Sequence, residues 1–208
     1  MKESKRNSRI RALVKCVNSH RKKQAAQIDM LCKDIIASHS NFLDTVRTLS
    51  FAAEFYESII GVRNLEEMFC TCASVIRKQI GDVNLVFFIS RQADFQSYAF
   101  DCSTNGTEEI NRLEQYFTRE LIESVTKTNH PCSPDELLGM GLQVSPAILK
   151  NLSVITVPIA ANGPIVGFIL LYVNDGQHLD RHQIKPLSYI RRGLLQGIRT
   201  CTVEQPNS

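Results

Sequence analysis

The chain has 208 residues, of which 43% are apolar, and its net charge is only +3. This composition excludes a chain that is disordered throughout, because it offers enough apolar surface to build a core. The charge is unevenly spread, since nine of the 24 basic residues but only one of the 21 acidic residues lie within residues 1–23. We predict a flexible basic arm at 1–23. Such an arm can bind nucleic acid or another acidic partner, but a solvated terminus is the favoured interpretation.

Seven cysteines are an odd number, and the first 23 residues lack the apolar segment that an export signal requires. Free thiols in a reducing compartment are expected, and with them a cytoplasmic location. Residues 153–173 are uncharged and long enough to span a bilayer, but Asn162-Gly163-Pro164 in their middle is turn chemistry. We therefore predict no membrane span, and instead two strands at 152–160 and 165–173.

An apolar stripe with seven-residue spacing runs along residues 24–60, and neither Pro nor Gly interrupts residues 1–60. A heptad seam has two positions in each repeat. Here the first is apolar in every repeat, whereas the second is apolar in some repeats and small or polar in the others. This pattern predicts a long amphipathic helix at 24–60. Its stripe either pairs with a second copy or packs on its own domain. We expect a homodimer formed through Ile28, Leu31, Ile35, Phe42, Leu49, Tyr56 and Ile59.

A helix and a hairpin follow. Gly61 ends the long helix, Asn64 caps a second helix, and Gly81 ends that one. Residues 83–90 form an apolar run of strand length, and residues 95–100 alternate in part. With a polar turn between them, the two segments predict an antiparallel hairpin.

The second half of the chain predicts further helices. Thr107 is expected to cap a helix whose apolar stripe reaches Val125, and a short helical turn is expected at 135–140. Asp180 caps a closing helix, and Pro186 either lies near the true start of that helix or kinks it. Strands that meet through hairpins, with helices from both chain ends to cover them, indicate an α+β fold with an antiparallel sheet.

The end of the chain resembles a GAF domain. It holds a strand with Val157-Pro158-Ile159, a short turn, a strand with Val166-Gly167-Phe168-Ile169-Leu170, and a capped closing helix. The helix and hairpin at 64–100 match the family in order and spacing. The resemblance implies a GAF-like antiparallel sheet flanked by helices, preceded by a helix similar to signalling helices. The predicted organisation is an arm at 1–23, a helix at 24–60, a GAF-like domain at 62–200 and a tail at 201–208.

The resemblance also implies a ligand pocket between the sheet and the mid-chain helix. Members of this family bind cyclic nucleotides, haem, bilins or amino acids, but this chain lacks the cyclic-nucleotide signature and the patterns of bilin attachment. The cofactor is therefore unknown. The residues expected to line the pocket are Phe88, Ser90, Tyr98, Phe100, Cys102, Cys132, Thr156 and Phe168.

No catalytic residue and no metal site is predicted. Cys102 and Cys132 fall in loops expected to flank the pocket, as in a GAF-fold methionine sulfoxide reductase, but no base or cation adjoins them in the sequence. His130 and Cys132 offer two metal donors, without a second pair at matching spacing.

We expect a sensory or regulatory protein that binds a small molecule. It would signal through its flanking helices to a dimer partner or to a separate output protein. One alternative is a ligand-free dimerisation or scaffold module whose pocket is filled by its own phenylalanines. The other is an enzyme like the free methionine-R-sulfoxide reductases, using the loop cysteines.

Overall fold

The computed structural model describes residues 2–91, 94–101, 112–145, 149, 152–160, 165–173, 179 and 181–203. It does not describe the side chains of residues 2–6, 8, 9, 12, 181, 182 and 203. The chain divides into two units, Met1–Arg47 and Thr48–Ser208. The described elements are, in order, α1 (Lys2–Ile59), α2 (Leu65–Ile80), β1 (Asn84–Arg91), β2 (Asp94–Phe100), η2 (Leu113–Tyr116), α3 (Arg119–Lys127), α4 (Pro134–Gly139), β3 (Ser153–Ile159), β4 (Gly167–Val173), α6 (Arg181–Ile184) and α7 (Leu187–Val203).

The long helix α1 begins at Lys2 and continues to Ile59. The prediction of a flexible arm is therefore corrected for residues 2–23, which are helical. Lys and Arg have high helix propensity, and no Gly or Pro interrupts the segment. The boundary predicted at residue 24 marks a change in charge and not a change in backbone. Within the described residues, no helix has a stretch apolar and long enough to cross a bilayer.

The last turns of α1 belong to the folded body. Phe51, Ala52, Phe55 and Ile59 are all buried in one core cluster with residues of α2, α7 and the sheet. The body therefore begins inside the helix and not at residue 62 as predicted. Ile59 was expected to form a dimer contact, but it is 9% exposed within its own chain.

Local capping sets the limits of α2, as the sequence predicts. The side chain of Asn64 accepts hydrogen bonds from the backbone N–H groups of Glu66 and Glu67, at 2.8 and 3.4 Å. Gly81, with a φ of +106°, ends the helix, and its N–H donates to the carbonyl of Arg77. The Arg77 guanidinium in turn donates to the carbonyls of Val83 and Phe100, at 3.0 and 2.6 Å.

The four strands form one antiparallel sheet in the order β2-β1-β4-β3. Both predicted hairpins are confirmed, with ends that differ by one or two residues from those expected. Every residue of β4 is buried, which fits a central strand covered on both faces. Pro158 lies in β3, an edge strand, where its missing N–H is tolerated.

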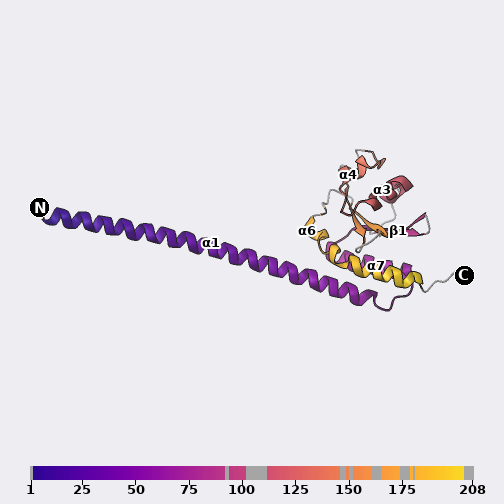
Figure 1. Cartoon of the computed structure of the whole chain (residues 1–208), viewed down its shortest axis with the longest axis horizontal. Coiled ribbons are helices and arrows are strands. Elements are labelled where there is room, and N and C mark those ends of the chain that lie inside the picture. Colours follow the sequence, from indigo (N-terminus) through magenta and orange to yellow (C-terminus); the bar gives the residue numbers. More distant parts are fainter. Residues whose placement is uncertain are drawn as a thin grey trace. The chain divides into compact units, whose positions relative to one another are not determined.

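The first face of the sheet packs against a layer of helices made by α2, α7 and the end of α1 (Figure 1). Phe87 of β1 points into this layer and stacks on Phe69 of α2, with ring centroids 4.6 Å apart. Two glycines of α7 allow the helices to approach closely. A Cβ added at Gly193 would lie 2.0 Å from the ring of Tyr56, and one at Gly197 would lie 2.7 Å from the sulfur of Met68. A side chain at either position would therefore require Tyr56 or Met68 to shift.

The second face of the sheet packs against η2, α3 and α4. The sequence predicted one continuous helix up to Val125, but the structure has a short 3-10 helix and then α3. The break occurs because Phe117 and Thr118 are extended and the Thr118 side chain caps α3, accepting from the N–H of Leu121. The helical turn predicted at 135–140 is α4, with a capping box between Ser133 and Glu136.

Pro186 separates the two closing helices. α6 ends at Ile184 and α7 starts at Leu187, so the proline immediately precedes the longer helix, as one of the two predicted alternatives requires. α7 continues past residue 200, and the side chain of Cys201 is buried against the core. The predicted tail at 201–208 therefore starts within a helix. The predicted caps Thr107 and Asp180 and the turn Asn162-Gly163-Pro164 lie outside the described residues.

Candidate functional site

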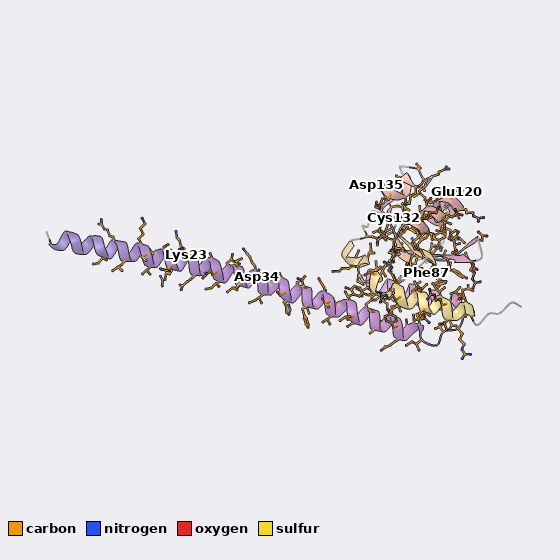
Figure 2. The ribbon with its side chains drawn as sticks, viewed as in Figure 1. Lys23, Asp34, Phe87, Glu120, Cys132 and Asp135 are labelled. Carbon is orange, nitrogen blue, oxygen red and sulfur yellow. The ribbon has the colours of Figure 1, made fainter. Side chains whose placement is uncertain are left out.

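The residues predicted to line one pocket lie on both faces of the sheet. Phe88 and Phe168 belong to the cluster on the second face, and Cys132 lies there too, on the side of α4 (Figure 2). Tyr98 and Phe100 pack against the cluster on the first face. The prediction is corrected for these last two residues, because the register pairs Tyr98 with Phe87, and side chains of paired residues share a face.

The other predicted residues fall in three kinds of place. Thr156 is buried, and its β4 partner Leu170 belongs to the second-face cluster. Ser90 is exposed near the end of β1. Cys102 lies outside the described residues. The structure thus brings together four of the eight predicted residues, those being Phe88, Cys132, Thr156 and Phe168.

The rings of Phe88 and Phe168 pack with a third aromatic ring on this face of the sheet. Phe88 stacks on Phe168 at 4.8 Å and on Phe117 at 5.4 Å, and the centroids of Phe117 and Phe168 are 6.1 Å apart. Nearby, the Tyr172 hydroxyl donates to a carboxylate oxygen of Glu114 at 3.0 Å. Burial, reinforced by the negative charge of Glu114, raises the pKa of the Tyr172 phenol, which therefore remains protonated. Among the described residues, this face is a packed core.

A groove lies instead at the open edge of β3 and has a volume of about 610 Å³. One wall is the loop that leads into α4, the other is formed by α6 and the start of α7, and β3 makes the floor. Fourteen residues line this β3-edge groove: His130, Pro131, Ser133, Pro134, Glu136, Ser153, Val154, Ile155, Val157, Leu179, Ile184, Lys185, Ser188 and Arg191.

Two hydrogen bonds, one of them to a side chain, fix the loop wall on the edge of β3. The N–H of Cys132 donates to the hydroxyl of Thr156 at 3.1 Å, and the N–H of Thr156 donates to the carbonyl of Cys132 at 3.2 Å. Cys132 therefore continues the hydrogen bonding of the sheet by one residue. Its side chain is fully buried, in contrast to its exposed neighbours His130 and Pro131.

The opposite wall of the groove carries positive charge. Lys185 and Arg191 line this wall. One terminal nitrogen of Arg191 donates to the side chain of Asn129 at 3.3 Å. Its Nε is buried and finds no acceptor within the part of the chain that the structure describes. Partial burial lowers the pKa of the Arg191 guanidinium, but this group stays charged at neutral pH.

Sequence reasoning missed the residues of the helical wall. Arg191 lies in a helix with a clear apolar stripe, where a charged residue indicates only a solvated face. No local sequence pattern indicates that the Arg191 side chain contacts Asn129. Glu136 did leave a signal, since Ser133 and Glu136 have the spacing of a capping box. That spacing brings the Glu136 carboxylate back over the loop that holds Cys132.

No family model matches the chain, and no curated protein matches it. Solved structures do, at low identity. The chain is similar to the GAF domain of a phosphoenolpyruvate-protein phosphotransferase from Acinetobacter, with 10% identity, a TM-score of 0.55, and coverage of 77% of this chain and 97% of that one. The corresponding domain from Coxiella burnetii gives 12% identity, a TM-score of 0.52, and coverage of 76% and 95%. The chain therefore has a GAF-like fold, as the sequence resemblance implied.

Proposed function

We propose that this chain is a regulatory protein whose GAF-like body binds a small anionic molecule in the β3-edge groove and whose α1 helix pairs with a second copy. The observation that carries the ligand proposal is the guanidinium of Arg191. Its Nε–H is buried without an acceptor among the described residues. A buried donor without a partner costs about 1–3 kcal/mol, so a shift of the Arg191 side chain that brought its Nε–H to an anion in the groove would recover that energy.

The dimensions and the lining of the groove suit such a ligand. Its volume of about 610 Å³ lies within the range of about 300–1,000 Å³ that is usual for small-molecule sites. Lys185 and Arg191 offer positive charge for a carboxylate or a phosphate, and Arg191 suits planar or bidentate recognition of either. Val157, Leu179 and Ile184 supply apolar surface for the rest of the molecule.

The helix α7 connects this groove to α1. Arg191 lines the groove, and two residues further along the same helix Gly193 contacts the ring of Tyr56. The hydroxyl of Tyr56 also donates to the backbone carbonyl of Tyr189 at 3.1 Å. A ligand that moved or stiffened α7 would therefore act directly on the end of the helix proposed to dimerise. This contiguity of packed groups is the physical basis we propose for signalling.

The proposed dimer uses the apolar stripe of α1. Ile28, Leu31, Ile35, Phe42 and Leu49 are between 58% and 67% exposed within the chain. Burying such a stripe against a second copy is the usual role of heptad repeats. The expected contacts Tyr56 and Ile59 are no longer included, because both pack against the chain's own body.

A thermal-shift screen of the full chain tests the ligand proposal, using a library of metabolites that carry carboxylate or phosphate groups. We expect at least one compound to raise the melting temperature in a concentration-dependent way. Arg191→Gln should abolish that response. Arg192→Gln is the matched control, since Arg192 is exposed on the same helix and does not line the groove. A response that Arg191→Gln leaves intact would refute the proposal.

The ligand-free scaffold is the second candidate. It is favoured by the phenylalanines that fill the second face of the sheet, where the family resemblance implied a pocket. If every compound in the screen leaves the melting temperature unchanged while α1 still dimerises, this candidate replaces the first. The enzyme alternative is not proposed, because Cys132 is fully buried and Cys102 lies outside the described residues.

A further inference from the structure

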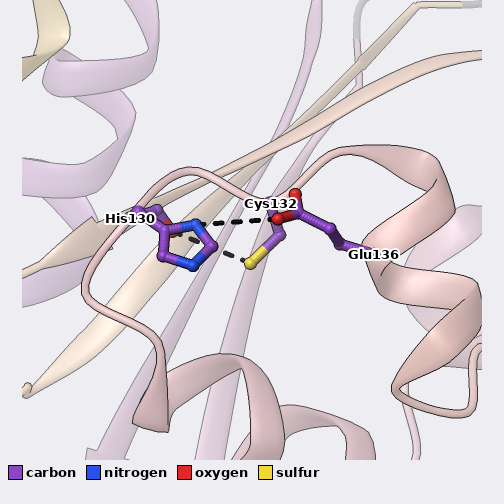
Figure 3. A group of neighbouring side chains, drawn as sticks. All are labelled: His130, Cys132 and Glu136. Carbon is purple, nitrogen blue, oxygen red and sulfur yellow. Dashed lines mark hydrogen bonds and ion pairs between the residues drawn. The ribbon is translucent and has the colours of Figure 1, made fainter.

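We propose that His130, Cys132 and Glu136 form a binding site for Zn²⁺ at the rim of the β3-edge groove. One ring nitrogen of His130, the sulfur of Cys132 and one carboxylate oxygen of Glu136 all lie within 4.8 Å of one another (Figure 3). The three residues come from a single loop and the start of α4, so the site does not require that the proposed small molecule be bound.

The donor set matches the preference of zinc. Zn²⁺ is bound in proteins by nitrogen from His, sulfur from Cys and oxygen from Asp or Glu, at about 2.0–2.3 Å. Tetrahedral bonds of that length separate neighbouring donors by roughly 3.3–3.8 Å. To bind zinc, the donor atoms of this cluster must therefore move closer to one another by roughly 1 Å. The side chains of His130 and Glu136 are 60% and 45% exposed, so both have room to turn.

The sulfur occupies the most firmly held position of the three. Two hydrogen bonds between Cys132 and Thr156 anchor its backbone to β3, at 3.1 and 3.2 Å. The sulfur itself lies 3.2 Å from the hydroxyl of Thr128 and 3.7 Å from the carbonyl of His130. Once the thiol gives up its proton to bind a metal, the Thr128 hydroxyl can rotate to donate to the thiolate, giving up its hydrogen bond to the carbonyl of Val125 at 2.7 Å. Such a second contact orients and stabilises a metal ligand.

Neighbouring groups of the same loop also orient the carboxylate of Glu136 and the imidazole of His130. Oε2 of Glu136 accepts from the N–H and the hydroxyl of Ser133, at 2.7 and 3.0 Å, while Oε1 faces Nδ1 of His130 at 4.0 Å. Nδ1 of His130 also lies 3.1 Å from the carbonyl of Pro131. Either ring nitrogen of the neutral imidazole can bind Zn²⁺: Nε2 when Nδ1 donates its proton to this carbonyl, and Nδ1 in the other tautomer.

The position of the cluster suggests what the fourth ligand is. Three protein ligands leave one position of a tetrahedral zinc open, as in sites that bind water or a substrate. Both His130 and Glu136 line the β3-edge groove. The open position is thus accessible from the groove, and water or an anion in the groove would complete the coordination.

Cobalt provides a direct test on the full chain, kept reduced and free of metal beforehand. We expect one equivalent of Co²⁺ to produce a thiolate-to-cobalt charge-transfer absorption that Zn²⁺ then displaces. Cys132→Ser should abolish this absorption. The matched control is Cys201→Ser, a buried thiol on α7 outside the cluster. The proposal is overturned if no such absorption appears, or if it survives Cys132→Ser.

A second set of variants covers the chance that Cys132→Ser disturbs folding. His130→Ala and Glu136→Gln alter exposed side chains, so the fold should be retained, as circular dichroism would verify. Each should weaken binding of Zn²⁺, measured by competition with a chelator, by at least tenfold. Glu123→Gln, a carboxylate on α3 outside the cluster, should change nothing. Unchanged zinc affinity in His130→Ala would show that His130 and Glu136 form a surface ion pair and not a metal site.

Discussion

The two ends of the apolar stripe on α1 have opposite surroundings. Between Ile28 and Leu49 the stripe is exposed, whereas its last residue, Ile59, is buried in the core of the body, as is Phe55 beside the stripe. The helix geometry is the same at both ends. The difference shows that a heptad pattern determines which residues share a face but not whether that face meets the same chain or a second copy.

The largest expected effect compares two phenylalanines of this one helix. Phe55 is fully buried and Phe42 is 65% exposed. Phe55→Ala should lower the free energy of unfolding of the body by about 3–5 kcal/mol, because it leaves a cavity in the core. At a protein concentration too low for self-association, Phe42→Ala should leave that free energy nearly unchanged. Denaturant titration followed by circular dichroism measures both, and equal losses would contradict the division of the helix into two environments.

A charge placed on the stripe tests the proposed dimer. Ile35→Lys should weaken self-association by at least 100-fold, since it places an unpaired charge in the apolar seam. Ile36→Lys is the matched control, because Ile36 is equally exposed, at 68% against 67%, but lies outside the stripe. Sedimentation equilibrium would report the association constants. A wild-type chain that remains monomeric at high concentration, or two variants that behave alike, would count against the dimer.

The contact between α1 and α7 is sensitive to a single methyl group. Gly193→Ala would place a Cβ 2.0 Å from the ring of Tyr56, and the displacement needed should cost about 1–3 kcal/mol of stability. Adding Tyr56→Ala to this variant should remove the clash, so the double variant should lose less than the sum of the two single losses. Strictly additive losses in denaturant titrations would mean that the two groups do not meet.

The smallest expected effect concerns one hydroxyl. Tyr56→Phe removes the hydrogen bond to the carbonyl of Tyr189 and should cost about 0.5–1.5 kcal/mol, near the lower end because the group is partly exposed. Tyr189→Phe retains the backbone carbonyl and is the matched control. Thermal unfolding of both variants at one protein concentration would show the difference, and a larger loss in Tyr189→Phe would argue against this bond.

Local chemistry could be predicted from the sequence more reliably than long-range geometry. The caps of α2, at Asn64 and Gly81, follow from the preferences of single residues and are confirmed. The faces of β2 depend on its register against β1, which the sequence alone did not reveal, so Tyr98 and Phe100 were assigned to the wrong face. The β3-edge groove combines two loops and two helices distant in sequence. No local pattern marks Arg191 as a part of it.

The hydrogen bonds of the Arg77 side chain should affect the order in which parts of the body unfold. From the last turn of α2 it donates to the carbonyl that precedes β1 and to the one that ends β2. A helix and a hairpin that are adjacent in the chain are thereby joined at one corner. We expect α2, β1 and β2 to open as one cooperative unit in native-state hydrogen exchange, with amides that lose protection together. In a chain with Arg77→Met, which keeps a long apolar stem but no donors, the hairpin amides should exchange ahead of those of the helix.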